Sequence, residues 1–214
     1  MDPNGRCFFD FETVANPAAV ALLPDPTPPS NYKDPDKIAA WVADKKAAAI
    51  ESAALDPDLG AIAAVSWLVY GDPAGQQTLL VDEDVPDEAA LLRAFWKVLT
   101  EKVGAHYLVG YNILGFDLPW LMRRSMAHGI PANWPMKLSK YQVDPITDLY
   151  GILYNWQPGK GLKTVAALHN IPNPLAGLDG SMFPQMPPDL QRQYVGNDVQ
   201  LCVHLFNLMN GIYF

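Results

Sequence analysis

RCFFDFE, residues 6–12, has the strict two-residue alternation of a β-strand. One face of this strand carries only Cys7, Phe9 and Phe11, whereas Asp10 and Glu12 share the other face with a phenylalanine. Two neighbouring carboxylates in a half-buried position repel each other and are costly to ionise without a counter-charge. The stretch therefore predicts a core strand whose acids bind a cation. The alternative is an edge strand on which both acids are solvated.

A second acidic position lies in the closing segment, Pro188 to Met209, which has the 3.6-residue period of an amphipathic helix. Its expected buried stripe consists of Leu190, Tyr194, Asp198, Leu201, Leu205 and Leu208. A spacing of four residues places Tyr194 one turn from Asp198. Alternatively, Tyr194 only packs in the core and Asp198 pairs with an arginine such as Arg192.

The third acidic position is Asp117 in GYNILGFDLPWL, residues 110–121, at an expected junction between a strand and a helix. Aspartate is also a favoured helix N-cap, so a purely local role is the alternative. Taken together, Asp10, Glu12, Asp117 and Asp198 could converge to hold hard, oxygen-preferring cations, which predicts two Mg²⁺ or Mn²⁺ ions. Such a pair can activate water, orient a phosphate and stabilise a leaving oxygen.

The remaining pattern predicts an α/β fold, a mixed sheet flanked by helices. Further strands are expected at 61–70, 76–81, 106–111 and 141–143, and helices at 36–54, 87–103, 118–127 and 163–169. Residues Val14 to Pro35 are rich in proline and are expected to form a loop. We expect a single domain over 1–214, with a proline-rich loop and helix inserted at about 15–59.

The composition limits the possible binding surfaces and the location. A net charge of -8 argues against a broad basic surface for nucleic acid, although acids gathered around cations contribute to that count. The pairs Lys160 with Lys163 and Arg123 with Arg124 are interpreted as solvated surface. Two cysteines far apart give little support to a disulfide. The polar start and short apolar runs predict a cytoplasmic protein with no membrane partner.

Three stretches resemble, in the right order, the signature motifs of the DnaQ-like, or DEDD, 3′-5′ exonucleases. They are FDFET at 9–13, YNILGFDLPWL at 111–121 and YVGND at 194–198. The superfamily divides on a histidine five positions, or a tyrosine four positions, before the last aspartate. Here Gln193 occupies the first position and Tyr194 the second, so the chain resembles the tyrosine subclass. GLKTVAALHNIP, residues 161–172, is similar to stand-alone polymerase-B-like exonucleases, some of them encoded by phages. This similarity implies the cytoplasm of a bacterium or of a phage-infected host.

The resemblance covers roughly Arg6 to Phe206 but departs between Val14 and Leu59. It implies an RNase H-like fold and release of nucleoside 5′-monophosphates from a 3′ end, of single-stranded DNA or frayed ends. A DNA polymerase or replication proteins would be partners. The alternatives are an RNA-directed exonuclease, an RNase H-like endonuclease and a catalytically silent nucleic-acid-binding module.

The resemblance also implies a role for each site residue. Asp10 would bridge both metal ions, Glu12 and Asp198 would complete the first site, and Asp117 would support the second. Tyr194 would orient the attacking water. The residues expected to contact the terminal and penultimate nucleotides are Thr13 and Val14, and Asn112 and Phe116, respectively.

Overall fold

The computed structural model describes residues 4–103, 107–132, 136 and 138–214. The chain divides into two compact units, which we describe separately. The first unit comprises Met1–Glu12 and Ala63–Phe214, and the second comprises Thr13–Ile62. The expected insertion at 15–59 lies within the second unit, and a single domain stays a prediction.

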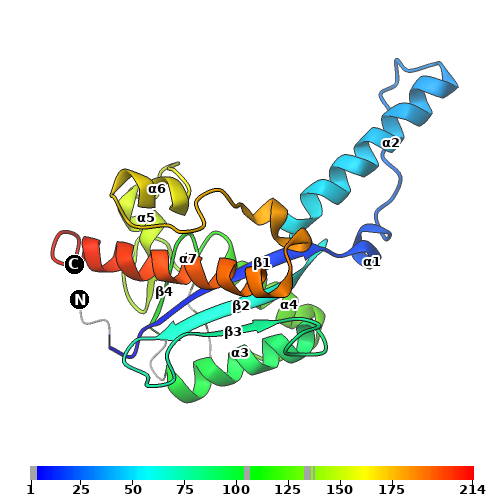
Figure 1. Ribbon diagram of the computed structural model, residues 1–214. Helices are drawn as coiled ribbons and strands as arrows, with labels where there is room; N and C mark the ends of the chain where they lie inside the picture. Colours follow the sequence, from blue (N-terminus) through cyan, green and yellow to red (C-terminus); the bar gives the residue numbers. More distant parts are fainter. Residues whose placement is uncertain (1–3, 104–106, 133–135, 137) are drawn as a thin grey trace. The chain divides into compact units, whose positions relative to one another are not determined.

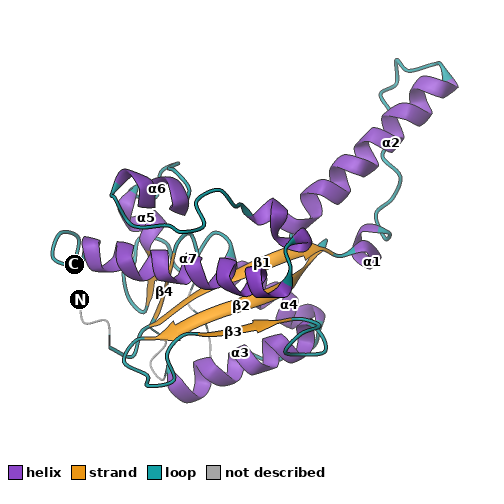
Figure 2. Ribbon diagram, in the orientation of Figure 1, coloured by secondary structure: helices purple, strands orange, loops and turns teal. Residues whose placement is uncertain are grey.

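The first unit is built on a mixed five-stranded sheet of order β3-β2-β1-β4-β5. Figure 2 shows its strands in orange. Its strands are β1 (Cys7–Ala15), β2 (Gly60–Val69), β3 (Gln77–Leu80), β4 (Leu108–Gly110) and β5 (Ile146–Asp148). Strand β4 is parallel to both β1 and β5, whereas β2 and β3 are antiparallel. Because β1 is the central strand, the alternative that it is a solvated edge strand is wrong.

Two helices cover the two faces of the sheet: α7 (Pro188–Met209) lies across one face and α3 (Glu88–Lys102) across the other (Figure 1). The alternation in β1 produces this sandwich. Phe8 packs edge-on against Phe206 of α7, with ring centroids 5.4 Å apart, whereas Phe9 packs against Phe95 of α3 at 5.3 Å. The predicted α/β fold is therefore confirmed, and the two residues next to each other in sequence belong to opposite halves of the core.

The other helices of the first unit are short. They are α4 (Asp117–Ala127), α5 (Leu149–Leu153), α6 (Leu162–Leu168) and the 3₁₀ helix η2 (Gly180–Gln185). Helix α7 packs against α5 and α6 as well as against β3 and β4. Its expected stripe is buried except at its ends, where Leu208 is 44% exposed. In the part of the chain that the structure describes, no helix is long and apolar enough to cross a membrane.

The last strand lies later in the sequence than its apolar pattern predicted. A strand at Tyr141–Val143 is wrong, because Tyr141 has a left-handed backbone with φ of 65°. The strand is instead β5, in which Thr147 and Asp148 are both buried. Polar side chains in a buried strand give no hydrophobic signal. The strand expected from His106 begins at Leu108 as β4, and His106 itself lies outside the described residues.

The second unit contains the proline-rich segment and a long helix. Where a loop was predicted from Val14, β1 continues to Ala15 and a short helix α1 (Pro17–Val20) follows, capped by the side chain of Asn16. Helix α2 (Pro35–Ser52) starts at the Asp34 cap and is followed by a 3₁₀ turn, η1 (Ala53–Leu55). All of α2 is described, and none of its residues is buried.

Candidate active site

Three of the predicted acids meet on the face of the sheet covered by α7. Asp10 and Glu12 project from β1 and Asp198 projects from α7, and each offers an oxygen within 4.8 Å of the others. The two-residue spacing keeps Asp10 and Glu12 on this face, and the helical spacing turns Asp198 toward them. All three side chains are more buried than exposed, so the cluster belongs to the fold interior and not to a solvated surface.

Asp117 lies in the same cleft but is held separately. It is the first residue of α4, with Phe116 at the cap position, so Asp117 does not cap the helix. Its side chain is 3% exposed and accepts a hydrogen bond from the backbone N–H of Phe11, 3.1 Å away. The carboxylate of Asp117 is thus hydrogen-bonded to β1, the strand that carries Asp10 and Glu12.

Burial raises the pKa of each acid above its ordinary value. For Asp10 the main cause is loss of solvent, and the charges of Asp117, Asp198 and Glu12 add to it. Burial, followed by the charge of Asp198, raises the pKa of Glu12 to about 8. Burial likewise raises the pKa of Asp117 to about 7. Four carboxylates that resist ionisation need positive charge to become ionised together.

Lys163 supplies one such charge, and its interpretation as solvated surface is wrong. It lies on α6 with its ammonium 3.4 Å from a carboxylate oxygen of Asp198. It also donates hydrogen bonds to the carbonyl of Leu178, at 3.1 Å, and to the hydroxyl of Tyr194. The alternative partner for Asp198, Arg192, pairs instead with Asp84 at 2.8 Å. Lys163 was missed because its site is made by packing of α6 on α7, which no local spacing encodes.

Tyr194 is buried one turn before Asp198, as its spacing predicted. Tyr194 is 2% exposed, and burial together with the charges of Glu12 and Asp198 raises the pKa of its hydroxyl. The ammonium of Lys163 lies 3.8 Å from the centre of its ring. Gly180 of η2 closes this side, since a β-carbon there would lie 3.5 Å from a carboxylate oxygen of Glu12. The tyrosine is therefore fixed as a neutral hydroxyl beside the acids.

A cleft of about 390 Å³ opens above the acids. It is lined by Asp10, Phe11, Glu12, Tyr111, Asn112, Phe116, Asp117, Tyr150, Gly159, Lys160, Gly161, Leu162 and Asp198. Two of the predicted substrate contacts, Asn112 and Phe116, are among these residues. The other two, Thr13 and Val14, belong to the second unit, where the Thr13 hydroxyl donates to the carbonyl of Ala54 at 2.5 Å.

A further buried acid, Asp148, shapes the cleft and was not foreseen. Its side chain is 2% exposed and accepts hydrogen bonds from the backbone N–H groups of Asn112 at 2.9 Å and Leu114 at 3.0 Å. It also caps α5 through the N–H of Gly151 at 3.2 Å. Asn112 has a left-handed φ of 62°, and these bonds hold the turn in that conformation.

The donor set tests whether a metal ion fits. Every ligand atom in the Asp10, Glu12 and Asp198 group is a carboxylate oxygen, which suits hard divalent cations such as Mg²⁺ and Mn²⁺. Lys163 alone cannot balance four carboxylates whose pKa values are all raised. The residues therefore fit a divalent cation.

The mixed five-stranded sheet with helices on both faces is an RNase H-like α/β fold, and the acidic cleft lies on the face covered by α7. Residues 55–197 match the family described as "Predicted 3'-5' exonuclease related to the exonuclease domain of PolB", and the chain belongs to this family. The matched stretch includes Asp117 and Tyr194, whereas Asp198 lies immediately after it and Asp10 and Glu12 lie well before its start. The predicted resemblance to polymerase-B-like exonucleases is thus confirmed.

A solved structure supports the fold independently. The chain resembles the family B DNA polymerase from the hyperthermophilic archaeon Pyrobaculum calidifontis, with a TM-score of 0.61 and 19% sequence identity. The alignment covers 95% of this chain but only 24% of the polymerase chain. A comparison with curated proteins found no match.

Proposed function

We propose that the chain removes nucleotides from the 3′ end of nucleic acid by hydrolysing the terminal phosphodiester, with single-stranded DNA or frayed DNA ends as substrate. The observation that carries this proposal is the convergence of Asp10, Glu12 and Asp198, with oxygens within 4.8 Å of one another, beside the buried hydroxyl of Tyr194. Membership of an exonuclease family supports the same reaction. The products would be nucleoside 5′-monophosphates.

Asp10, Glu12 and Asp198 would hold one divalent cation, and Asp117 together with Asp10 would support a second. Once bound, Mg²⁺ or Mn²⁺ ions would polarise the scissile phosphate and make water a better nucleophile. The protein's part is to keep the carboxylates converged before the ions arrive. The N–H of Phe11 and the ammonium of Lys163 support this role, because they bind the oxygens of Asp117 and Asp198 respectively.

Tyr194 would orient the attacking water and would not act as its base. Its raised pKa keeps the hydroxyl protonated at neutral pH. Lys163 donates to the oxygen of that hydroxyl, which leaves the phenolic hydrogen to point toward water or a phosphate oxygen. Because it binds both Tyr194 and Asp198, Lys163 has a positioning role in this proposal.

The four proposed substrate contacts divide into two pairs, one for each of the last two nucleotides. Asn112 and Phe116 line the cleft and are proposed to contact the penultimate nucleotide. Thr13 and Val14 are proposed to contact the terminal nucleotide. Since Thr13 already donates its hydroxyl hydrogen to Ala54, its oxygen would serve as an acceptor for a 3′-hydroxyl. A polymerase or another replication protein is the proposed partner.

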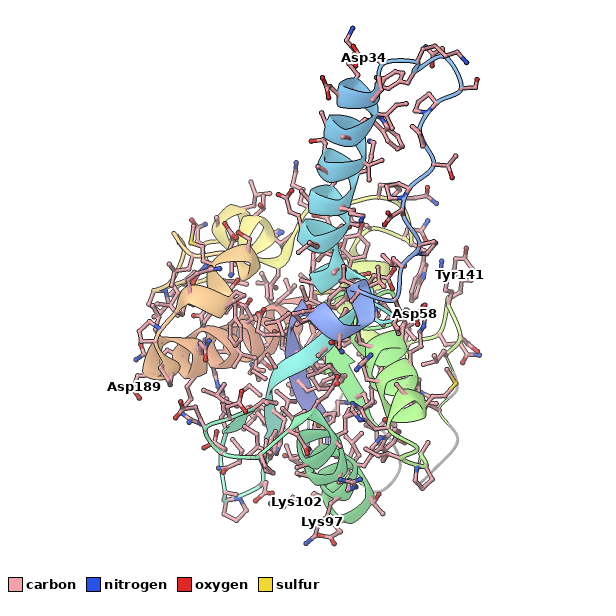
Figure 3. All side chains as sticks on the ribbon, turned by 90° about the vertical axis from the view of Figure 1, so that its right-hand side faces the viewer. Asp34, Asp58, Lys97, Lys102, Tyr141 and Asp189 are labelled. Carbon is pink, nitrogen blue, oxygen red and sulfur yellow. The ribbon has the colours of Figure 1, made fainter. Side chains whose placement is uncertain are left out.

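The test compares 5′-labelled DNA and RNA oligonucleotides incubated with Mg²⁺ or Mn²⁺. The wild type should produce a ladder that shortens from the 3′ end, and Asp10→Asn and Asp198→Asn should abolish it. Asp189→Asn is the matched control, because this exposed acid lies at the start of α7 (Figure 3). Cleavage inside a 3′-blocked strand would indicate an endonuclease, and activity that survives both site substitutions would refute the proposal.

A further inference from the structure

The segment that joins α5 to α6 has a backbone that is held in place at several points. Asn155 and Trp156 both have left-handed φ values, 49° and 62°, which asparagine adopts readily but which are costly for a bulky tryptophan. The N–H of Trp156 donates to the carbonyl of Gly151 at 2.8 Å, and its ring lies so close to Gly151 that a β-carbon there would clash with it. Such a conformation persists only when its surroundings enforce it.

Two tyrosine hydroxyls tie the next residues to the cleft. The hydroxyl of Tyr111 donates to the carbonyl of Lys160, and the N–H of Gly159 donates to the hydroxyl of Tyr150 at 2.7 Å. Gly159 must be a glycine here, because a β-carbon would clash with the ring of Tyr154. The backbone at 159–161 is thus positioned by groups that themselves line the cleft.

This arrangement brings one positive side chain to an acidic cleft. Among the described residues that line the cleft, Lys160 is the one cation beside Asp10, Glu12, Asp117 and Asp198. Lys163 is engaged with Asp198 and Tyr194. The sequence PGKG at 158–161 lacks the spacing of a nucleotide-binding loop. A nucleotide-binding motif therefore does not explain why a lysine lies at this position beside the acids.

We propose that residues 157–161 form a substrate-guiding loop in which Lys160 binds a backbone phosphate of the nucleic-acid strand that enters the cleft. The inference rests on the proposed exonuclease function. A chain with a net charge of -8 has little general attraction for a polyanion. A lysine fixed at the cleft therefore contributes a large share of the electrostatic binding free energy. Its carbonyl is held by Tyr111, while its exposed side chain extends from a fixed point.

The test measures steady-state kinetics and binding as a function of salt. Lys160→Ala should raise KM for an oligothymidylate roughly fivefold and change kcat by less than about twofold, since a phosphate contact away from the reacting atoms acts on binding. The slope of the logarithm of affinity against the logarithm of salt concentration should become shallower by about 0.7, the value for one phosphate of a single strand. Lys160→Arg should restore both quantities.

Two further variants distinguish phosphate binding by Lys160 from a general effect of net charge and from a change in the conformation of the loop. Lys97→Ala removes the same charge from α3, on the opposite face of the sheet, and should leave KM and the salt slope unchanged (Figure 3). Tyr111→Phe removes the hydroxyl that holds the loop and should raise KM while keeping the salt slope of the wild type. Binding is measured with an oligothymidylate whose last linkages are phosphorothioates, so that the probe survives.

The outcomes distinguish the two proposals. If the wild type degrades the strand and Lys160→Ala keeps both KM and the salt slope, the loop inference is overturned and the exonuclease proposal stands. If the wild type binds with a slope that depends on Lys160 but hydrolyses nothing, the exonuclease proposal alone is overturned. A wild type that neither binds nor hydrolyses the strand overturns both.

Discussion

Replacing Glu12 with glutamine should make the metal-free protein more stable at alkaline pH. The pKa of Glu12 rises from 4.5 to about 8 in the folded protein because the side chain is buried beside Asp198. The stability that accompanies a protonated Glu12 is therefore fully present below about pH 4.5 and is lost as the pH rises toward about 8. Glutamine stays neutral and has no such loss.

The size of the effect follows from the shift. One pKa unit corresponds to about 1.4 kcal/mol, so the rise from 4.5 to about 8 sets an upper limit of about 5 kcal/mol. Because Glu12 keeps some contact with solvent, which screens its charge, we expect about 2 kcal/mol at pH 8. In a chain of this length that corresponds to an increase in Tm of about 4–8 °C.

The assay is thermal unfolding in EDTA at pH 5 and pH 8, followed by addition of Mg²⁺ or Mn²⁺. Glu12→Gln should exceed the wild type in Tm at pH 8 and approach it at pH 5, whereas metal should stabilise the wild type more than the variant. Glu101→Gln, on the exposed side of α3, is the matched control and should show no pH-dependent difference. A variant that is less stable than the wild type at pH 8, or a gap that does not change with pH, would contradict the reasoning.

Three other substitutions test buried polar contacts of the first unit. Arg124 of α4, interpreted above as solvated surface, is buried and donates two hydrogen bonds to the carboxylate of Glu88 of α3, at 2.9 and 2.8 Å. Glu88→Gln should lower the free energy of unfolding by roughly 3 kcal/mol, because glutamine lacks the charge and one of the two acceptors, and an unchanged urea midpoint would refute this. Asp148→Asn should lower it by about 1–2 kcal/mol and raise KM, since the turn at Asn112 loses an acceptor; a loss of stability with KM unchanged would exclude that link to the cleft. Lys163→Met should reduce kcat far more than KM, because Asp198 and the tyrosine hydroxyl lose their common partner, and equal kcat values would show that the lysine does not position them.

The sequence predicts those parts of the site in which one strand or one helix alone determines the direction of the side chains. In β1 the period of two residues puts Asp10 and Glu12 on one face, whatever packs there. In α7 the spacing of four residues does the same for Tyr194 and Asp198. The convergence of these acids needed only the assumption that a strand and a helix bury their apolar faces together.

The parts that escaped prediction depend on contacts between elements. Lys163 meets Asp198 because α6 packs against α7, and a lysine in a short helix looks like surface in any local pattern. Asp148 lies in a strand whose buried residues are polar, so hydrophobic periodicity missed both the strand and its role.

The alternation in β1 also restricts how this sequence can change length. Phe9 and Phe11 face Phe95, while Asp10 and Glu12 face α7, so one residue inserted or deleted inside the strand, between Cys7 and Asp10, would exchange the two faces beyond that point. The carboxylates would then enter an aromatic core, and rings would occupy the cleft. An insertion after Glu12, the last acid of the strand, leaves this alternation unchanged. The second unit begins at the next residue, Thr13.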